Sequence, residues 1–243
     1  MLTTQFYTIE PPARPVNPYD GDPLAELNQL RESCARVLAA AYPTAVVNDS
    51  PGPSVSISGG SLRRKIDVVI SNWWDTNEYQ SLRKKVVRGV RVFDSKAYER
   101  IDNRPFLHNA RIEERDAALA GNVRKVARLL KSVKYDADTN VDISSYDITS
   151  IAYRMPEEFM RLGHGEELAL VENTRMFLRF LVDTPSYRDS LRVPNEMRPI
   201  FGGKGATVAG LSRLYQELQD LVDDINRDLA RSLRKLEEAR VSY

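Results

Sequence analysis

The chain has 243 residues, of which 42% are hydrophobic and 28% are charged, so it can bury one large core or two small ones. Its 35 Lys and Arg residues nearly balance 34 Asp and Glu residues, giving a net charge of +1, which excludes a global field that would indicate nucleic acid or a membrane surface. No apolar run approaches the roughly 18 residues of a membrane span. A single cysteine, Cys34, and an N-terminus without a targeting pattern favour the cytoplasm.

The first predicted elements are an irregular segment and an amphipathic helix. Four prolines between residues 11 and 18 predict an irregular lead-in over residues 1–22. From Leu24 to Tyr42 the apolar residues fall at helical spacing. Asp22 and Pro23 are typical of a helix start, and Pro43 of a helix stop.

A β-hairpin follows, and it carries one acidic residue on an apolar strand. Gly59 and Gly60 supply the turn between a short strand starting at Ser54 and a second strand at residues 66–70. The acidic residue is Asp67. Because an unpaired charge is costly to desolvate, its carboxylate needs a basic partner, hydrogen bonds or a metal ion. The basic residues available nearby are Arg63, Arg64 and Lys65.

After a further strand at residues 89–94, the pattern changes to helices. Apolar residues three and four apart predict helices at residues 122–134, 143–155, 166–181 and 208–236. The last helix carries a leucine stripe that we expect to pack on the body of the protein rather than on another chain. The fold class is therefore α+β: a small mixed or antiparallel sheet within residues 23–109, followed by a helical domain at 110–243.

The order of three segments resembles one family of enzymes. The strand at residues 65–69, the helix at 122–131 and the start of the next helix at 144–148 resemble motifs of template-independent nucleotidyltransferases. The branch is the oligoadenylate synthetase and bacterial cyclic-oligonucleotide synthase (CD-NTase) group. The resemblance covers about residues 24–200 and implies a nucleotidyltransferase-like sheet before the helical domain.

The resemblance implies a role for each of four residues. Lys131 matches a lysine that grips the triphosphate, Ser145 a serine on the phosphates, and Tyr146 a tyrosine near the base. Asp67 matches the third of three carboxylates that hold magnesium ions, so it is both the catalytic and the metal-ligating candidate. The implied ligands are a nucleoside triphosphate, with ATP expected, and Mg²⁺.

Residue chemistry supports these roles but leaves simpler ones open. Nucleotidyl transfer needs carboxylate-held metal ions and a fixed cation over the phosphates, and a hydroxyl at a helix start favours anions. Lys131, however, lies among other basic residues of its helix and also fits a solvated face. Ser145 also fits a helix N-cap, and Tyr146 fits core packing.

The sequence departs from the family at its first two carboxylates. These form an Asp-x-Asp pair on a strand after a Gly-Ser turn, upstream of the third carboxylate. Before Asp67 only Asp20 and Asp22 have that spacing, in a proline-rich segment where Asp22 is better explained as a helix cap. Since one carboxylate binds magnesium weakly, we expect poor catalysis from these residues alone. An active enzyme would need the pair from upstream sequence or from a protein partner that completes the sheet.

Two other classes of function remain open. One is an inactive nucleotide-binding or regulatory module, for example in antiviral defence. The other is a helical interaction protein that forms oligomers through its C-terminal helix. His108, His164 and Cys34 do not have the spacing of a zinc site, and His108 is expected to be structural. The segment Gly202–Gly205 lacks the phosphate-loop spacing and predicts a flexible connection. Trp73 and Trp74 are expected to anchor the core rather than stack a base.

Overall fold

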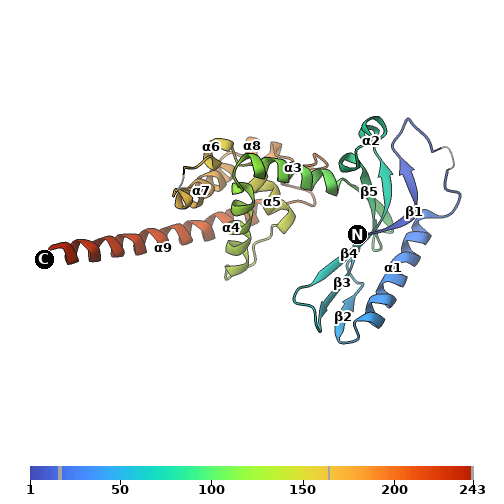
Figure 1. The fold of residues 1–243 in the computed structure, drawn as a ribbon, viewed down its shortest axis with the longest axis horizontal. Coiled ribbons are helices and arrows are strands. Elements are labelled where there is room, and N and C mark those ends of the chain that lie inside the picture. The colour runs from blue at the N-terminus through green and yellow to red at the C-terminus, as the bar shows by residue number, and fades with distance from the viewer. Residues whose placement is uncertain (16–17, 164, 242–243) are drawn as a thin grey trace. The chain divides into compact units, whose positions relative to one another are not determined.

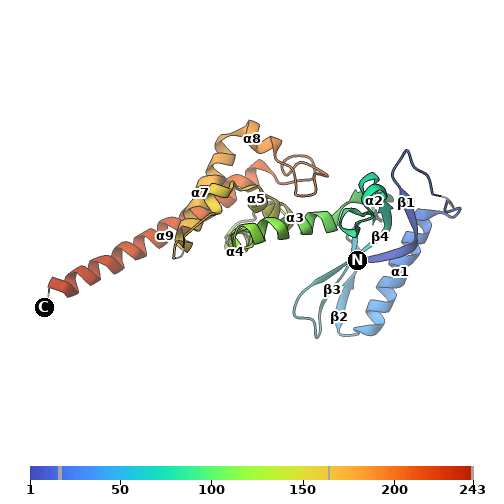
Figure 2. The ribbon, with the colours of Figure 1, turned by 45° about the horizontal axis from the view of Figure 1, so that its top comes forward.

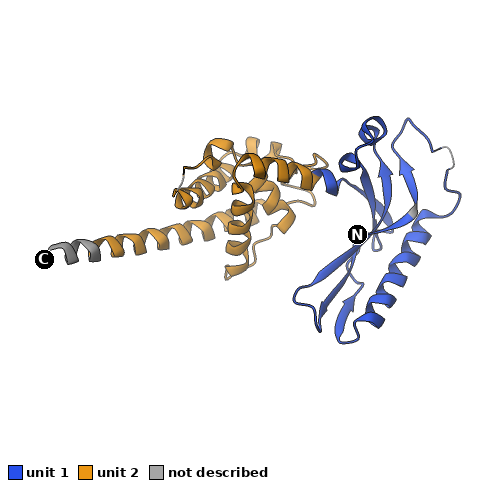
Figure 3. Ribbon diagram, viewed as in Figure 1, with its two compact units in different colours: residues 1–107 blue, residues 108–243 orange. Residues whose placement is uncertain are grey.

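The computed structural model describes residues 1–15, 18–163 and 165–241. These residues form two compact units, residues 1–107 and residues 108–243 (Figure 3). The sequence placed this boundary at residue 109. The first unit is a sheet with one long helix, and the second is helical, as the α+β prediction requires (Figure 1).

The described part of the first unit contains a six-stranded mixed sheet. Five strands pair antiparallel in sequence order: β2 (Ala45–Asn48), β3 (Ser54–Gly59), β4 (Ile66–Asp75), β5 (Gly89–Asp94) and β6 (Glu99–Asn103). The sixth strand, β1 (Leu2–Ile9), runs parallel to β4. A short helix, α2 (Asn77–Leu82), and a 3-10 turn at Lys85–Val87 connect β4 to β5.

Strand β4 is the longest strand and organises the sheet. Its residues 66–69 pair with β3, and residues 71–74 pair with β5. The N–H of Ser95, just after β5, donates to the carbonyl oxygen of Gly52, just before β3, at 3.0 Å. The end of β5 therefore meets the start of β3 along one edge of β4. Because β1 pairs with the residues that also pair with β5, β1 lies along the opposite edge.

Helix α1 (Pro23–Ala41) packs against the sheet in both views (Figures 1 and 2). Asp22 caps its first turn by accepting hydrogen bonds from the N–H groups of Leu24 and Ala25, as predicted. The core between helix and sheet contains Phe6, Leu27, Ile70 and Phe93. Cys34 is partly buried at its border.

The predicted hairpin and the strand at residues 89–94 are confirmed. Gly59 and Gly60 have φ values of +80° and +59°, which side chains rarely adopt, and a Cβ on Gly60 would lie 2.7 Å from Thr44 Oγ1. These two positions explain the double glycine.

Three strands of the first unit, β1, β2 and β6, were not predicted. Residues 2–9 form a strand rather than part of an irregular lead-in, because they pair with β4 some 65 residues later, beyond the reach of a local pattern. Among the described residues, 10–15 and 18–22 lie outside helices and strands. Strands β2 and β6 are short and half-exposed, so they carry weak hydrophobic alternation.

The second unit packs its helices around one core. Its helices are α3 (Pro105–Ala118, which begins within the first unit), α4 (Asn122–Asp136), α5 (Ser145–Arg154), α6 (Glu157–Met160), α7 (Glu167–Asp183), α8 (Pro185–Ser190) and α9 (Val208–Val241). The four helices predicted from periodicity correspond to α4, α5, α7 and α9. Buried side chains of this core include Leu130, Ile148, Leu178 and Leu214.

Helix α9 packs on the unit over only part of its length. Leu211, Leu214, Leu218 and Val222 are buried. Further along, Leu229 and Leu233 are 46% and 61% exposed, and in both views α9 extends past the other helices of its unit (Figures 1 and 2). The expected packing on the body of the protein therefore holds for the first half of α9 and not for the described second half. None of the helices, as far as the structure describes them, combines the length and apolarity needed to cross a bilayer.

Candidate functional site

Asp67 lies near the start of β4, opposite Ser56 of β3. Side chains alternate along a strand, so Asp67 faces away from the side on which Val68 and Ile70 pack under α1. Its carboxylate is 3.4 Å from the Lys65 ammonium, and the two side chains are 52% and 57% exposed. The local ion pair that the sequence offered as the simple explanation is therefore present. The expectation of a desolvated carboxylate is wrong, because half of this side chain contacts solvent.

Lys131 lies on α4, next to the buried face formed by Val126, Leu130 and Val133. Its side chain is half-exposed, and it has no ion pair or hydrogen bond within the part of the chain described. The neighbouring Lys134 differs, since its ammonium donates to the carbonyl oxygen of Ile143 at 2.5 Å and so ties α4 to the segment before α5. Of these two lysines, only Lys131 is left to meet a ligand.

Ser144, rather than Ser145, caps helix α5. The Ser144 hydroxyl oxygen accepts from the N–H of Asp147 at 3.0 Å and donates to the Asp147 carboxylate at 2.7 Å. The cap resembles a capping box, except that the Asp147 carboxylate accepts from the Ser144 hydroxyl rather than from the Ser144 backbone N–H. The N-cap alternative for Ser145 is therefore wrong, and its hydroxyl lies free of that task in the first turn of the helix.

Tyr135 contacts Ser145, and the sequence reasoning missed it. Its hydroxyl is 3.4 Å from Ser145 Oγ, and its side chain is 71% exposed. Because Tyr135 follows Lys131 by four residues, the two share one face of α4. The hydroxyls of Tyr135 and Ser145 thus meet at the N-terminus of α5, and Lys131 lies one turn before Tyr135 on the same face of α4. The four-residue spacing was the available signal.

Tyr146 is half-buried and packs against the helical core, so its packing role is confirmed. Its ring stacks on His108, with centroids 4.2 Å apart and planes inclined by 16°. The Arg198 guanidinium carbon is 5.2 Å from the ring centroid. Burial is the largest of the effects that raise the pKa of Tyr146, so its hydroxyl stays protonated at neutral pH.

A buried ion pair holds Arg198 in place. Arg198 Nη2 donates to the Asp147 carboxylate at 2.6 Å, and the Asp147 side chain is only 2% exposed. Burial, assisted by the charge of Arg198, lowers the pKa of His108 to about 4. His108 is therefore neutral at pH 7, and Arg198 supplies the positive charge next to the tyrosine.

The described residues contain no cluster of three or more Asp, Glu, His or Cys side chains that could hold a metal ion. His164 lies outside them. Asp67 is thus a lone carboxylate with a lysine partner. Since Mg²⁺ is usually held by more than one carboxylate or by substrate phosphates, these residues do not by themselves fit a magnesium site.

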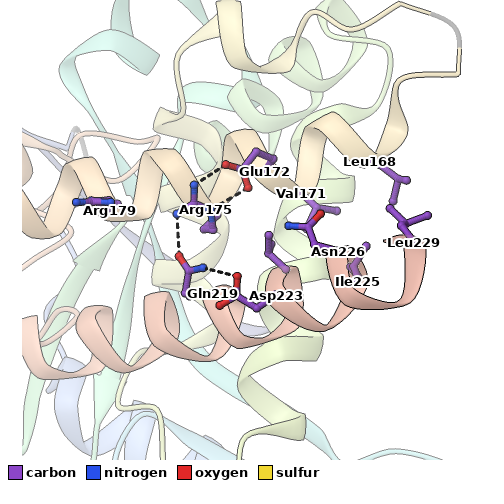
Figure 4. Close-up of a pocket in the computed structure, with 11 residues that line it drawn as sticks. Leu168, Val171, Glu172, Arg175, Arg179, Gln219, Asp223, Ile225, Asn226 and Leu229 are labelled. Carbon is purple, nitrogen blue, oxygen red and sulfur yellow. Dashed lines mark hydrogen bonds and ion pairs between the residues drawn. The ribbon is translucent and has the colours of Figure 1, made fainter. Parts of the chain in front are cut away.

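A separate groove of about 430 Å³ lies between α7 and α9 (Figure 4). Arg175 crosses it, donating to Gln219 Oε1 at 2.8 Å and pairing with Glu172, whose hydrogen bond raises the pKa of the guanidinium. None of the four predicted site residues lines this groove. The two arginines that line it are already paired, Arg175 with Glu172 and Arg179 with Asp183, so the groove offers no unpaired arginine to an anion.

This chain is similar in sequence and in fold to bacterial cyclic dinucleotide synthases. No family profile matches the chain. A cyclic dinucleotide synthase CdnE from Yersinia aleksiciae is 38% identical over 204 residues, which are 83% of this chain and 54% of that protein. The solved structure of a STING-associated CdnE c-di-GMP synthase from Flavobacteriaceae sp. has a TM-score of 0.70 at 24% identity, covering 87% of this chain and 60% of that one.

This chain is CD-NTase-like. A third protein shows the same fold at lower identity: a Rhodothermus marinus CdnE c-UMP-AMP synthase, solved with Apcpp and Upnpp, has a TM-score of 0.64 at 14% identity over 89% of this chain and 73% of that one. The CD-NTase-like chain spans about half the length of the curated relative from Yersinia. The predicted resemblance and the α+β fold class are thereby confirmed.

Proposed function

We propose that this chain provides the triphosphate-binding helices and one catalytic carboxylate of a nucleotidyltransferase. The observation that carries the proposal is the contact of Tyr135 with Ser145 at the start of α5, with Lys131 one helical turn before Tyr135 on the same face of α4. A helix N-terminus favours anions, and Lys131, which has no protein partner among the described residues, adds a full positive charge. Tyr146, on the next position of α5, is the candidate to contact the base.

The implied triphosphate is ATP by our sequence reasoning, whereas relatives carry the name c-di-GMP synthase. Both ATP and GTP therefore belong in a binding test. Calorimetry of the 243-residue chain with each nucleotide and Mg²⁺ should give a measurable Kd, and Lys131→Ala should weaken it about tenfold or more, as for loss of a charged hydrogen bond. Lys125→Ala is the matched control, because Lys125 is an exposed lysine of the same helix. No heat up to about 1 mM nucleotide would refute binding.

For transfer, Asp67 would supply one ligand of a Mg²⁺ site whose other carboxylates come from another strand. The sheet has a suitable place for that strand. β1 is in register with β4 from the pair Leu2 and Ile70 onward, and Asp67 lies three residues before Ile70. In the described residues, β4 at 66–69 pairs only with β3, on the other edge. A strand that continues the line of β1 toward Asp67 would bring its side chains level with this carboxylate.

This completion is testable with added polypeptide. Expressing the chain with a segment that carries a Gly-Ser turn and an Asp-x-Asp strand, fused before Met1 or supplied as a second protein, should produce nucleotidyl transfer with Mg²⁺. Asp67→Asn should abolish the transfer and leave Lys131-dependent nucleotide binding largely intact. Transfer that persists in the Asp67→Asn variant would show that Asp67 is not a catalytic ligand.

The nucleotide-binding result also separates enzyme from regulatory module. Binding without transfer in the completed protein would favour an inactive nucleotide-binding module, for which a role in antiviral defence remains our proposal. A cytoplasmic location, expected from the single cysteine, belongs to the same proposal.

A second candidate function is association through α9, which the exposure of Leu229 and Leu233 favours. Removing residues 227–243 keeps the buried Leu211, Leu214, Leu218 and Val222 and so tests association without emptying the core. Light scattering should show a lower oligomeric state for the truncated chain. An unchanged mass would remove this role.

A further inference from the structure

The ring of Tyr146, a residue of α5, contacts groups from two other segments of the second unit. His108 comes from α3, and Arg198 comes from the segment between α8 and α9. The His108 ring lies nearly parallel to the tyrosine ring at 4.2 Å between centroids. At 4.2 Å the two rings are in contact, so the tyrosine ring cannot turn about its own axis without displacing the histidine.

Arg198 is itself immobilised at the same place. It donates to the Asp147 carboxylate at 2.6 Å and to the carbonyl oxygen of Pro199 at 2.9 Å, while its guanidinium carbon is 5.2 Å from the tyrosine ring centroid. Asp147 is anchored in turn by Ser144, the cap of α5. The Asn195 side chain forms a hydrogen bond with Tyr146. Both the ring and the hydroxyl of Tyr146 are therefore fixed, although the residue keeps partial contact with solvent.

His108 is a costly residue to bury, and its planar ring explains why it occupies this position. It is 5% exposed, and its Nδ1 is buried with no hydrogen-bond partner in the described structure. Burying an unmatched polar nitrogen is unfavourable, and a leucine would fill a similar volume without that cost. A leucine, however, has no planar face to set the plane of an aromatic neighbour. The planar contact with Tyr146 therefore distinguishes His108 from an apolar side chain that would only fill the same volume.

We propose that His108 is a positioning residue for nucleotide binding, which holds the Tyr146 ring in the orientation that receives the nucleobase. The inference rests on the proposed function, because the ligand is the nucleoside triphosphate. Holding the ring before binding removes the entropy that a mobile side chain would lose on contact with the base, an effect of roughly two- to tenfold in Kd. The fixed ring should not affect the affinity for the phosphates, which we expect to contact Lys131 and Ser145.

The base and the phosphates are separated by comparing two ligands. Calorimetry would measure ATP and GTP with Mg²⁺ against inorganic tripolyphosphate, which has no base. His108→Ala should weaken nucleotide binding roughly two- to tenfold and leave tripolyphosphate binding unchanged. His108→Phe, which keeps a planar ring, should restore nucleotide binding, and His108→Leu, which fills space only, should not. Lys131→Ala is the contrasting variant, since it should weaken both ligands.

Each outcome decides the question. The positioning role is overturned if His108→Ala weakens both ligands equally or neither, or if leucine restores binding as well as phenylalanine does. If His108→Ala does not fold, the comparison of phenylalanine with leucine decides in its place. If the unchanged protein binds tripolyphosphate as tightly as nucleotide, the positioning role fails while the phosphate site stands. If it binds neither, the proposed function fails and this inference fails with it.

Discussion

A single substitution in the buried ion pair between Arg198 and Asp147 should clearly lower the free energy of unfolding. Asp147 is 2% exposed and receives hydrogen bonds from Arg198 and Ser144, whereas Arg198 is one-third exposed. In Arg198→Ala the carboxylate stays buried and loses its cation. Breaking a buried pair in this way typically costs about 3–5 kcal/mol. Because Ser144 still donates and water can reach the space left by a partly exposed arginine, we expect about 2–3 kcal/mol here.

Asp147 is fully buried and Arg198 is not, so comparing substitutions of the two residues gives a sharper test than the destabilisation of Arg198→Ala alone. In Asp147→Ala the arginine can turn toward solvent, so the loss is limited to the hydrogen bond from the Ser144 hydroxyl and the ion pair, about 1–2 kcal/mol. The double variant Asp147→Ala with Arg198→Ala should therefore be more stable than Arg198→Ala alone, because it no longer buries an unpaired charge. Arg179→Ala is the control, since Arg179 and Asp183 form a pair that is about 60% exposed on both sides. It should cost less than about 1 kcal/mol.

Urea unfolding followed by far-ultraviolet circular dichroism measures all four variants. With a slope of about 1.5–2 kcal/mol per molar urea for a unit of this size, Arg198→Ala should lower the midpoint of the helical unit by about 1–2 M. The reasoning is refuted if Arg198→Ala behaves like the Arg179→Ala control. It is also refuted if the double variant is less stable than Arg198→Ala.

Three further predictions test individual contacts. Ser144→Ala should destabilise the helical unit by about 1 kcal/mol in urea unfolding through loss of the α5 cap, whereas Ser145→Ala should leave stability nearly unchanged and weaken nucleotide binding; the reverse ranking would contradict the assigned cap. His108 has a folded pKa lowered to about 4, so it stabilises the fold above its unfolded pKa of about 6.5 and this stability is lost as the pH falls from about 6.5 to 4. His108→Phe should therefore lose less stability than the unchanged protein between pH 7 and pH 4, and equal losses would argue against a buried neutral histidine. Asp22→Ala should reduce stability by about 1 kcal/mol through loss of the α1 cap, and no change in the unfolding of the first unit would contradict that cap.

The sequence was sufficient where the interactions are local. The cap at Asp22, the turn at Gly59 and Gly60, and the apolar spacing of α4 and α9 act between residues a few positions apart, so their pattern is visible in the chain itself. The same holds for the motif residues Lys131, Ser145 and Tyr146, which lie on consecutive helices of one unit. Their roles in binding remain predictions, because the sequence predicts the helices that carry them but does not show which ligand they bind.

Only the tertiary structure decided which of these residues are occupied by structural tasks. It showed that Ser144 rather than Ser145 holds the cap, that Lys65 pairs with Asp67, and that Tyr135 contacts Ser145. It also revealed strand β1, whose partner lies at Ile70 and beyond, and the stack of His108 on Tyr146. These are contacts between distant or differently facing groups. Their energies depend on how helices and strands pack together, which residue propensity and spacing do not predict.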